Sequence, residues 1–473
     1  MCTVRIQTLG CRLNQIESES AAQLFIESGF NVKFSIDDFD NQTRLIIINT
    51  CAVTQKAEQK ARRIIRLAAK KYTNALVLVT GCYAQLSKKE IEALDPKIVV
   101  LGGQIKSRLA RLPQLLKKYE ACRDFSVSDF VLIVKNQLTS LPPVKVGFPE
   151  DSFKFAASSL QAHSRASLKI QDGCNNNCSF CTIHIARGHS VSLDVASALE
   201  RVQALEDKGY DEVVLTTINI AQYKGLFVDR NGVELYYNFA ELLKYLLAST
   251  KKICFRISSL YPEIVDKDFC QVIKNPRVRP HFHISVQSGS NKILELMNRK
   301  YNRDDVIKAC SDLRAAKPQC FLACDIITGF PSESDEDFEE TLELCRQCDF
   351  TWVHTFPFSA RPGTAAFDMK AKIPQSISQE RTRKLNDWAV TQKIKYINSF
   401  IGQALPAIIE KEQPDSSKNK YIYNCMTENF IHCQVTSPNP LQESKEYKIT
   451  ITDVLLENIH KGGEIEAIAH FVG

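Results

Sequence analysis

The chain of 473 residues is 44% apolar and 24% charged, which is ordinary for a globular protein. No apolar run approaches the length of a membrane span, and the amino terminus lacks the charged, apolar and small-residue regions of a signal peptide. We therefore expect a cytoplasmic protein of roughly two to four domains with no membrane partner. In that compartment, 17 cysteines indicate free thiols and metal ligation and argue against a disulfide framework.

The net charge of +6 is unevenly distributed along the chain. Residues 401–473 contain six Lys or Arg and ten Asp or Glu, a net charge of −4. Since the whole chain carries +6, the first 400 residues carry +10. A polyanionic partner is therefore expected to bind mainly to the first part of the chain.

Residues 1–120 are predicted to form an N-terminal parallel α/β domain. Over residues 1–103, short apolar strands alternate with helical patterns, as in a parallel sheet covered on both faces. The predicted strands are Val4–Leu9, Leu45–Asn49, Leu76–Thr80 and Ile98–Leu101. The predicted helices are Gln15–Ser28, Ala57–Tyr72 and Lys88–Leu94.

Three cysteines of this domain occupy equivalent positions. Cys11, Cys51 and Cys82 each lie just beyond the carboxyl end of one of the first three predicted strands. Parallel strands place their carboxyl ends at one edge of the sheet, where open α/β sheets bind ligands. The spacing therefore predicts that the three thiols lie together, the alternative being three unrelated buried cysteines.

Residues 121–160 are expected to be a linker, because they contain Leu141-Pro-Pro-Val144 and a polar stretch at Glu150–Ser152. Residues 161–392 are predicted to form a second α/β domain, in which six strand candidates alternate with helical stretches. Six such units indicate a partial (β/α)6 barrel with its chemistry at the carboxyl ends of the strands. The candidates are Ser167–Gln171, Glu212–Asn219, Ile253–Ser258, His281–Val286, Phe321–Thr328 and Thr351–Phe358.

Cys174, Cys178 and Cys181 form a C-x3-C-x2-C triplet in the loop after the first of these strands. Three thiolates can hold three irons of a four-iron cube and leave the fourth iron without a protein ligand. Such an open metal position is where substrate chemistry takes place, in contrast to a closed structural site. The alternatives are a zinc turn or a coincidence of small buried residues.

The end of the chain has a different pattern. A connecting helix is expected at 376–398, and residues 393–473 are assigned to the end of that helix and a small antiparallel β-barrel. The barrel prediction is based on short runs in which apolar and polar residues alternate, with Pro-Asn-Pro and Gly-Gly breaks between the later ones.

Several motifs resemble those of the radical S-adenosylmethionine methylthiotransferases. The triplet, with the aromatic Phe180 before its last cysteine, is similar to that of radical S-adenosylmethionine enzymes in general. Further similar segments are Thr8-Leu-Gly-Cys-Arg-Leu-Asn-Gln-Ile-Glu-Ser-Glu19, Asn49-Thr-Cys-Ala-Val-Thr54, Thr80-Gly-Cys-Tyr-Ala-Gln85, Gln287-Ser-Gly-Ser290, Met297-Asn-Arg299, Gly329-Phe-Pro-Ser-Glu333 and Phe358-Ser-Ala-Arg-Pro-Gly-Thr364. The resemblance covers almost the whole chain and implies a methylthiotransferase domain, a radical core and a C-terminal TRAM domain.

The segments around Cys11 and Cys51 most resemble the bacterial tRNA enzymes that act on N6-threonylcarbamoyladenosine. The branch acting on N6-isopentenyladenosine usually has Gln-Met-Asn after its first cysteine, and the ribosomal-protein branch Pro-Lys-Asn, whereas this chain has Arg12-Leu-Asn14. These two substrates remain alternatives. A non-catalytic iron–sulfur or zinc protein that binds RNA or transfers electrons is an alternative of a different class.

The resemblance implies methylthiolation at C2 of N6-threonylcarbamoyladenosine at tRNA position 37, with two [4Fe–4S] clusters and two S-adenosylmethionine molecules. Cys174, Cys178 and Cys181 would hold the cluster that cleaves S-adenosylmethionine, giving a radical that abstracts hydrogen from C2. Cys11, Cys51 and Cys82 would hold a second cluster that delivers sulfur. The implied partners are the tRNA anticodon stem-loop and an electron donor such as flavodoxin or ferredoxin.

Other residues are candidate contacts for S-adenosylmethionine, because they lie at or near the ends of barrel strands or beside the triplet. For the polar ones, the alternative is a polar residue that simply ends a strand, and the arginine could instead form a structural ion pair. The candidates are Phe180, Thr217, Asn219, Arg256, Gln287 and Ser288.

Basic residues recur along the predicted helix at 57–72 and suit a tRNA backbone. A solvated helix face is the alternative. The residues are Lys56, Lys60, Arg62, Arg63, Arg66 and Lys70.

Two features depart from the family pattern. The family usually continues with Arg and Ser after Ala186-Arg-Gly188, but this chain has His189-Ser-Val-Ser192. The C-terminal domain is net acidic, which leaves only a local basic patch, Lys418 and Lys420, for RNA binding. Cys345 and Cys348 form a C-x2-C pair without a second pair near it, which favours two buried thiols over a redox or zinc site.

Overall fold

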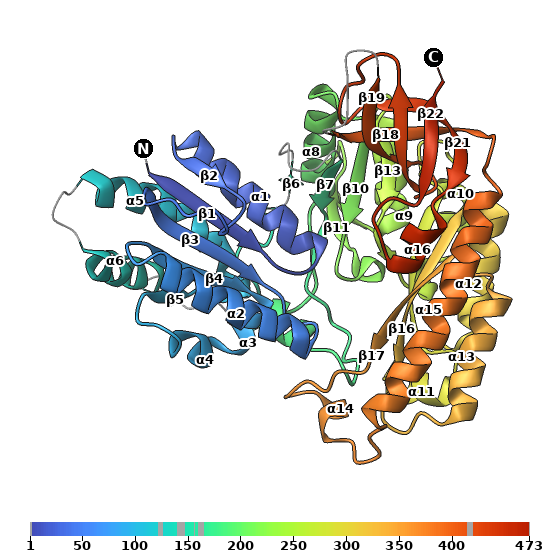
Figure 1. The fold of residues 1–473 in the computed structure, drawn as a ribbon, viewed down its shortest axis with the longest axis horizontal. Coiled ribbons are helices and arrows are strands. Elements are labelled where there is room, and N and C mark those ends of the chain that lie inside the picture. The colour runs from blue at the N-terminus through green and yellow to red at the C-terminus, as the bar shows by residue number, and fades with distance from the viewer. Residues whose placement is uncertain are drawn as a thin grey trace. The chain divides into compact units, whose positions relative to one another are not determined.

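The computed structural model describes residues 2–121, 126–139, 147–155, 157–158, 165–413 and 420–472 (Figure 1). The chain divides into two compact units. The first consists of Met1–Leu160, Lys169–Leu193 and Ser359–Phe367, and the second of Gln161–Leu168, Asp194–Phe358 and Asp368–Gly473. The loop with the Cys174–Cys181 triplet therefore belongs to the same unit as the N-terminal sheet.

A parallel sheet of five strands forms the centre of the first unit, in the order β2-β1-β3-β4-β5. The strands are β1 (Thr3–Thr8), β2 (Asn31–Lys33), β3 (Thr43–Thr50), β4 (Leu76–Gly81) and β5 (Ile98–Val100). Four of the five correspond to predicted strands. The sequence did not reveal β2, because its three residues are partly or fully exposed and form no apolar run.

Helices cover both faces of this sheet and bury two separate apolar cores. One face is covered by α1 (Arg12–Glu27), α5 (Leu112–Ala121) and α6 (Val127–Thr139). The other is covered by α2 (Gln55–Lys71), α3 (Cys82–Leu86) and α4 (Lys88–Glu92). The first unit also contains the 3-10 helix η1 (Gly103–Arg111), β6 (Ala157–Ser158), β8 (Gln171–Asp172), α7 (Ile183–Arg187) and β9 (Val191–Ser192).

Part of the segment predicted to be a linker belongs to the fold of this first unit. Helix α6 buries Phe130, Val134 and Leu138 in the same core as β1 and α1, and Phe155 joins them. The Pro-Pro dipeptide that suggested a linker lies outside the described residues. The apolar residues of α6 follow the spacing of a buried helix face. The Pro-Pro turn signal after the helix led to the prediction of a linker instead.

Each of the six predicted barrel strands has a counterpart in the structure. These are β7 (Ala166–Lys169), β10 (Glu212–Thr216), β13 (Cys254–Ile257), β15 (His281–Gln287), β16 (Phe321–Thr328) and β17 (Trp352–Pro357). One sheet contains β7, β10 and β13, and a second contains β14 (Ser259–Leu260), β15, β16 and β17. Strands β10 and β13 pair in parallel, and so do the neighbouring strands of the second sheet, as in a barrel that is not closed.

Five longer helices connect these strands: α8 (Val195–Asp207), α9 (Phe239–Ser249), α10 (Lys267–Ile273), α12 (Arg303–Ala316) and α13 (Asp335–Gln347). Each begins after a residue whose side chain accepts a hydrogen bond from a backbone N–H of the first turn, namely Asp194, Asn238, Asp266, Asn302 and Ser334. The shorter elements are η2 (Ile220–Gln222), β11 (Gly225–Val228), β12 (Glu234–Tyr237), η3 (Pro262–Ile264), α11 (Asn291–Leu296) and α14 (Ala365–Asp368).

The connecting helix α15 (Gln375–Asn398) leads into a closed five-stranded barrel of order β18-β19-β20-β22-β21. Its elements are β18 (Ala404–Glu412), β19 (Tyr421–Thr427), β20 (His432–Ser437), β21 (Glu446–Val454), α16 (Leu456–Lys461) and β22 (Ala467–Phe471). The predicted mixed α/β architecture with a small C-terminal barrel is confirmed. No helix in the described part of the chain is long and apolar enough to cross a membrane.

Candidate functional site

The structure places Cys11, Cys51 and Cys82 after three strands that are neighbours in the first unit's sheet. Cys11 immediately precedes α1, Cys51 follows β3, and Cys82 is the first residue of α3 after β4. Since β1, β3 and β4 are adjacent and parallel, their three carboxyl ends lie side by side. We call these three cysteines the rim trio.

Two glycines allow the chain to pack closely around the rim trio. Gly10 and Gly81 precede Cys11 and Cys82, and both have positive φ angles, of 104° and 99°. A Cβ atom on Gly10 would lie 2.4 Å from the Cβ of Cys51, and one on Gly81 would lie 2.3 Å from the carbonyl oxygen of Thr50. The loop carrying Cys51 therefore lies too close to its neighbours for any larger residue at either position.

Two buried asparagines connect the loops of the rim trio. The Nδ2 of Asn14 donates to the carbonyl of Leu9 at 2.9 Å and to that of Thr50 at 3.0 Å. The Nδ2 of Asn49 donates to the carbonyl of Asn14 at 2.9 Å, and the hydroxyl of Thr50 donates to the carbonyl of Thr80 at 2.6 Å. Residues just before each cysteine are thus linked to one another by hydrogen bonds that do not involve the thiols.

Burial controls the protonation of the rim trio. It raises the pKa of Cys51 to about 11, and the nearby Cys82 and Cys11 thiols raise it further. Burial also raises the pKa of Cys82, whereas Cys11 is exposed. Without metal, the two buried residues are therefore thiols, and a bound metal would deprotonate them.

The triplet lies on a loop held at its base by pairing of β8 with β9. The backbone N–H of Cys174 donates to the carbonyl of Gly188 at 3.0 Å. The sulfur of Cys174 accepts the N–H of Asn176, and the sulfur of Cys181 accepts the N–H of Ile183, both at 3.4 Å. Backbone hydrogen bonds to cysteine sulfur are a feature that tunes iron–sulfur clusters.

Among the described residues, no group of three or more His, Cys, Asp or Glu side chains could hold a single metal ion. The two sets of cysteines share one pattern of exposure. In each set two cysteines are buried and one is more exposed, Cys11 in the rim trio and Cys181 in the triplet. This suits a cube that is enclosed on one side and open on the other.

A buried group of five charged residues connects the rim trio to the base of the triplet loop within the first unit. Lys169 Nζ lies 3.0 Å from Glu17 Oε1 and 2.9 Å from Asp172 Oδ2. Arg187 Nη1 lies 2.9 Å from Asp172 Oδ1 and 3.2 Å from Glu17 Oε1, and Lys106 pairs with the other oxygen of Glu17. We call these residues the charge cluster.

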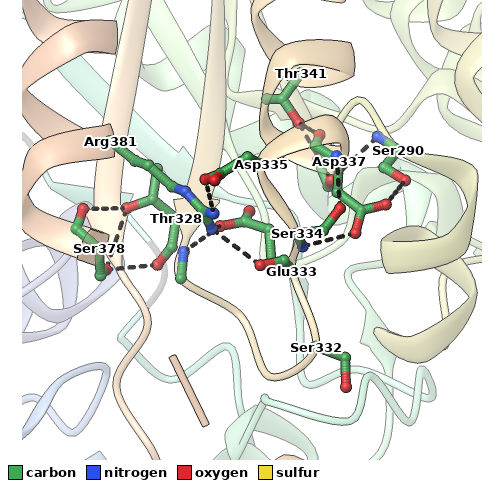
Figure 2. A network of polar contacts seen from close by, with 12 residues as sticks. Ser290, Thr328, Ser332, Glu333, Ser334, Asp335, Asp337, Thr341, Ser378 and Arg381 are labelled. Carbon is green, nitrogen blue, oxygen red and sulfur yellow. Dashed lines mark hydrogen bonds and ion pairs between the residues drawn. The ribbon is translucent and has the colours of Figure 1, made fainter. Parts of the chain in front are cut away.

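In the second unit, Gln287 and Ser288 lie at the carboxyl end of β15, as the sequence predicts. Gln287 has a φ of 73°, which is strained for a residue with a side chain, and such strain occurs often at functional sites. The Ser288 hydroxyl accepts the N–H of Ser290 at 3.2 Å, and the Ser290 hydroxyl donates to Asp337 of α13 at 2.7 Å. Figure 2 shows this part of α13 next to a second set of contacts around Arg381.

Thr217 and Asn219 follow the carboxyl end of β10. The backbone N–H of Thr217 donates to the Ser258 hydroxyl at 3.2 Å, and Asn219 caps η2 by accepting the N–H of Ala221 at 3.1 Å. Both are buried, and their placement is consistent with contact to a ligand at this edge. Phe180 is half-buried within the triplet of the first unit.

Arg256 does not point to that edge. Its guanidinium contacts both oxygens of Glu212, at 2.7 and 3.0 Å, and the backbone carbonyls of Thr427 and Glu428 in the C-terminal barrel. Because Glu212 is the first residue of β10, this ion pair lies at the amino-terminal edge of the sheet. The structure therefore corrects the expectation of cofactor binding and favours the structural alternative for Arg256.

The chain matches two family models. Residues 168–345 match the Radical SAM superfamily, and residues 3–103 match a family described as Uncharacterized protein family UPF0004. The Threonylcarbamoyladenosine tRNA methylthiotransferase MtaB of Treponema pallidum (strain Nichols) is 40% identical over 471 residues, which cover 91% of this chain and 94% of the relative. The protein of the same name from Aquifex aeolicus (strain VF5) is 32% identical over 90% of this chain and 95% of the relative.

The chain belongs to the radical S-adenosylmethionine tRNA methylthiotransferases. It is thus an enzyme that methylthiolates tRNA, and its family implies a [4Fe–4S] cluster and S-adenosylmethionine. Among solved structures, the radical S-adenosylmethionine methyltransferase TsrM from Kitasatospora setae aligns with a TM-score of 0.50 at 14% identity, covering 77% of each chain. That likeness supports the fold.

Most of the basic residues predicted to contact tRNA lie on the solvent-exposed face of α2. Lys56, Lys60, Arg63, Arg66 and Lys70 are exposed. Arg62 differs from them, because its Nη1 lies 3.1 Å from both the hydroxyl of Tyr83 and Glu90 Oε1. Lys418 lies outside the described residues, and Lys420 is exposed.

Sequence reasoning did not identify the charge cluster of this methylthiotransferase. Glu17 and Arg187 both belong to family motifs, but the motifs alone do not predict that the two side chains pair. One sign of the charge cluster is the position of Glu17 on α1, where it is buried together with the apolar residues Ile16 and Ala21. Cys345 and Cys348 are both buried, in agreement with two structural thiols.

Proposed function

We propose that this methylthiotransferase acts on N6-threonylcarbamoyladenosine at position 37 in the anticodon stem-loop of tRNA, using two [4Fe–4S] clusters and two S-adenosylmethionine molecules. The observation that carries this proposal is the presence of two separate sets of three cysteines in one compact unit. The names of the two relatives support threonylcarbamoyladenosine as the substrate.

In this proposal, Cys174, Cys178 and Cys181 hold the cluster that cleaves S-adenosylmethionine, and the rim trio holds the cluster that supplies sulfur. When bound, these groups supply radical and sulfur-transfer chemistry that amino-acid side chains cannot provide. The chain itself supplies the thiolates and fixes their loops through Asn14 and Asn49. Gln287, Ser288, Thr217 and Asn219 are candidates to orient S-adenosylmethionine.

Analysis of tRNA nucleosides tests the substrate. We expect that deletion of the gene removes 2-methylthio-N6-threonylcarbamoyladenosine and leaves its unmethylthiolated precursor, as measured by mass spectrometry of digested tRNA. Normal levels of the methylthio nucleoside in the deletion strain would rule out this substrate. Loss of the methylthio-isopentenyl nucleoside, or of a modified ribosomal protein, would support one of the alternatives instead.

Replacing one cysteine of the rim trio tests the division of labour. We expect Cys51→Ala to abolish methylthiolation while 5′-deoxyadenosine is still produced from S-adenosylmethionine. The reason is that the triplet, which would cleave S-adenosylmethionine, is intact in this variant. The measurement is chromatography of both products after anaerobic reconstitution and reduction with dithionite.

The matched control is Cys178→Ala, which should abolish both products because it removes a buried ligand of the triplet. Cys345→Ala, a buried cysteine outside both sets, should retain both. If Cys51→Ala also lost 5′-deoxyadenosine formation, the two clusters would not be independent. A fully loaded wild-type protein with about eight irons that released no 5′-deoxyadenosine would favour the non-catalytic class.

A further inference from the structure

The charge cluster is ionised although it is buried. Its five side chains are at most 8% exposed. Burial opposes ionisation, but the cations lower the pKa of Glu17 and Asp172, and the carboxylates raise the pKa of Lys169 and Arg187. Three cations face two anions, so the cluster has an excess of one positive charge. An uncompensated charge in the interior is costly unless an anion lies nearby.

Within the charge cluster, Arg187 contacts residues that lie near both sets of cysteines in the chain. Its Nη1 binds Asp172, two residues before Cys174, and its Nη2 donates to Asn14 at 2.8 Å. The Nε of Arg187 is buried and has no hydrogen-bond partner among the described residues.

The neighbours of Arg187 indicate what compensates its charge. A cavity of about 20 Å³, with room for one water molecule, is lined by Cys82, Lys106 and Arg187. Glu150 and Asp151 also line it, but Glu150 is already paired with Arg108 and Asp151 is exposed to solvent. A four-iron cube held by three thiolates is anionic, and it would supply the missing negative charge at this position.

We infer that Arg187 is a positioning residue that serves both cysteine sets: it fixes the base of the triplet loop through Asp172 and compensates the negative charge of the cluster on Cys11, Cys51 and Cys82. This inference is based on the proposed second cluster. A reduced cluster carries one more negative charge than an oxidised one, so a nearby buried cation stabilises the reduced form more. Loss of the Arg187 charge therefore lowers the reduction potential of the rim-trio cluster.

The experiment isolates the rim-trio cluster by replacing Cys174, Cys178 and Cys181 with alanine in the full chain. After anaerobic reconstitution, this parent variant should bind about four irons. Arg187→Gln is then introduced, and the midpoint potential is measured by a redox titration followed by electron paramagnetic resonance. Without Arg187, the charge cluster would retain two cations and two anions, so the variant has no buried charge excess that would prevent folding.

We expect a more negative midpoint potential for Arg187→Gln than for the parent, and a smaller change for Arg187→Lys, which keeps the charge. Arg5→Gln is the matched control, because Arg5 is also buried in the same unit but donates to the hydroxyl of Thr43, which lies at the opposite end of β3 from Cys51. It should leave the potential unchanged. If Arg187→Gln failed to fold, Arg187→Lys would still test the inference. Because lysine keeps the positive charge, the midpoint potential should stay close to that of the parent, and a large negative shift would contradict charge compensation.

The outcomes separate the two hypotheses. If the parent variant binds no iron, the proposed second cluster is wrong whatever Arg187 does. If it binds about four irons and Arg187→Gln leaves the potential unchanged, the second cluster stands and the role of Arg187 is refuted. In that case, Nε would interact only with water in the cavity.

Discussion

At the level of single residues, His354 of β17 illustrates how burial sets a protonation state. Its ring stacks on that of His283, with centroids 5.0 Å apart, and its Nδ1 lies 3.4 Å from Nε1 of Trp352. Burial lowers the pKa of His354 to about 4, and the neighbouring His283 lowers it further, whereas Asp325 opposes the shift. His354 is therefore neutral in the folded protein at neutral pH.

This lowered pKa predicts a pH-dependent stability. Between pH 6.5 and about 4, the unfolded chain binds a proton at His354 that the folded chain does not bind, so stability is lost as the pH falls through that range. We expect His354→Gln to reduce the loss of unfolding free energy between pH 7 and pH 5 by about 2 kcal/mol. Urea denaturation of the cluster-free protein at both pH values measures this difference.

The matched control is His470→Gln in the C-terminal barrel, where the histidine is exposed. It should not alter the pH dependence. An unchanged dependence in His354→Gln would show that this histidine titrates alike in the folded and unfolded chains.

At the level of elements, Arg381 attaches α15 to the loop between β16 and α13. Its Nη1 donates to the carboxylate of Glu333 at 2.5 Å and to the carbonyl of Glu333 at 3.1 Å, and its Nη2 lies 2.7 Å from Asp335 (Figure 2). The carboxylate of Glu333 also accepts the backbone N–H of Gly329 at 2.7 Å. One arginine thus holds the Gly329–Glu333 motif against the connecting helix.

We expect Arg381→Met to destabilise the protein by about 3 kcal/mol, because it leaves the carboxyl group of Glu333 buried without its cation. Burial already raises the pKa of Glu333, so its carboxyl group can become neutral when the arginine is removed. The expected destabilisation therefore lies at the lower end of the range for breaking a buried ion pair. Urea denaturation measures the change. The double variant Arg381→Met/Glu333→Gln should recover part of the stability, whereas the exposed Arg383→Met should cost little. No recovery in the double variant would mean that the ion pair is not the cause.

The elements themselves were largely predictable from sequence, because apolar periodicity determines which segments become strands and helices. The strands of the N-terminal sheet and the connecting helix α15 agree with their predicted positions to within a few residues. Among the exceptions are β2, which is too short to show a pattern, and α6, which lies in the segment predicted to be a linker. In both cases tertiary packing supplies what the local sequence does not show.

At the level of the whole molecule, the uneven charge favours tRNA binding away from the acidic C-terminal barrel. We expect replacement of Lys60, Arg63, Arg66 and Lys70 by Gln to weaken tRNA binding, because these exposed side chains of α2 would contact phosphates. Each lost contact should lower the slope of log Kd against log salt concentration by about 0.7 to 0.9. Fluorescence titrations at several salt concentrations measure the slope.

The control carries replacements of Lys308, Lys384 and Lys461 by Gln, each of which forms an exposed pair with an acidic residue four positions away on its own helix. It should leave the slope nearly unchanged. If both variants reduced the slope equally, α2 would contribute only through net charge and would not be a binding surface.

The cysteine sets were predictable from sequence, whereas their surroundings were not. Cys11, Cys51 and Cys82 follow equivalent strands, so the repeat alone brings them to one edge. The pairing of Arg187 with Asn14 and Asp172 joins residues up to 173 positions apart, and no local pattern encodes such a contact. No local pattern encodes the contacts of Arg256 either, because its backbone partners in the C-terminal barrel lie more than 170 positions away in the chain.

The asparagine links around the rim trio have a consequence for how the enzyme acquires its iron. Asn14 and Asn49 hold the cysteine loops through hydrogen bonds to backbone carbonyls, and because these bonds involve no thiol, they do not require a bound metal. In zinc fingers, by contrast, metal binding and folding are one event. In this protein, the conformational entropy of the cysteine loops is lost when the chain folds. Binding of iron to the rim trio is therefore a separate step that follows folding. Iron removed from the rim trio by a chelator should therefore be replaceable without refolding.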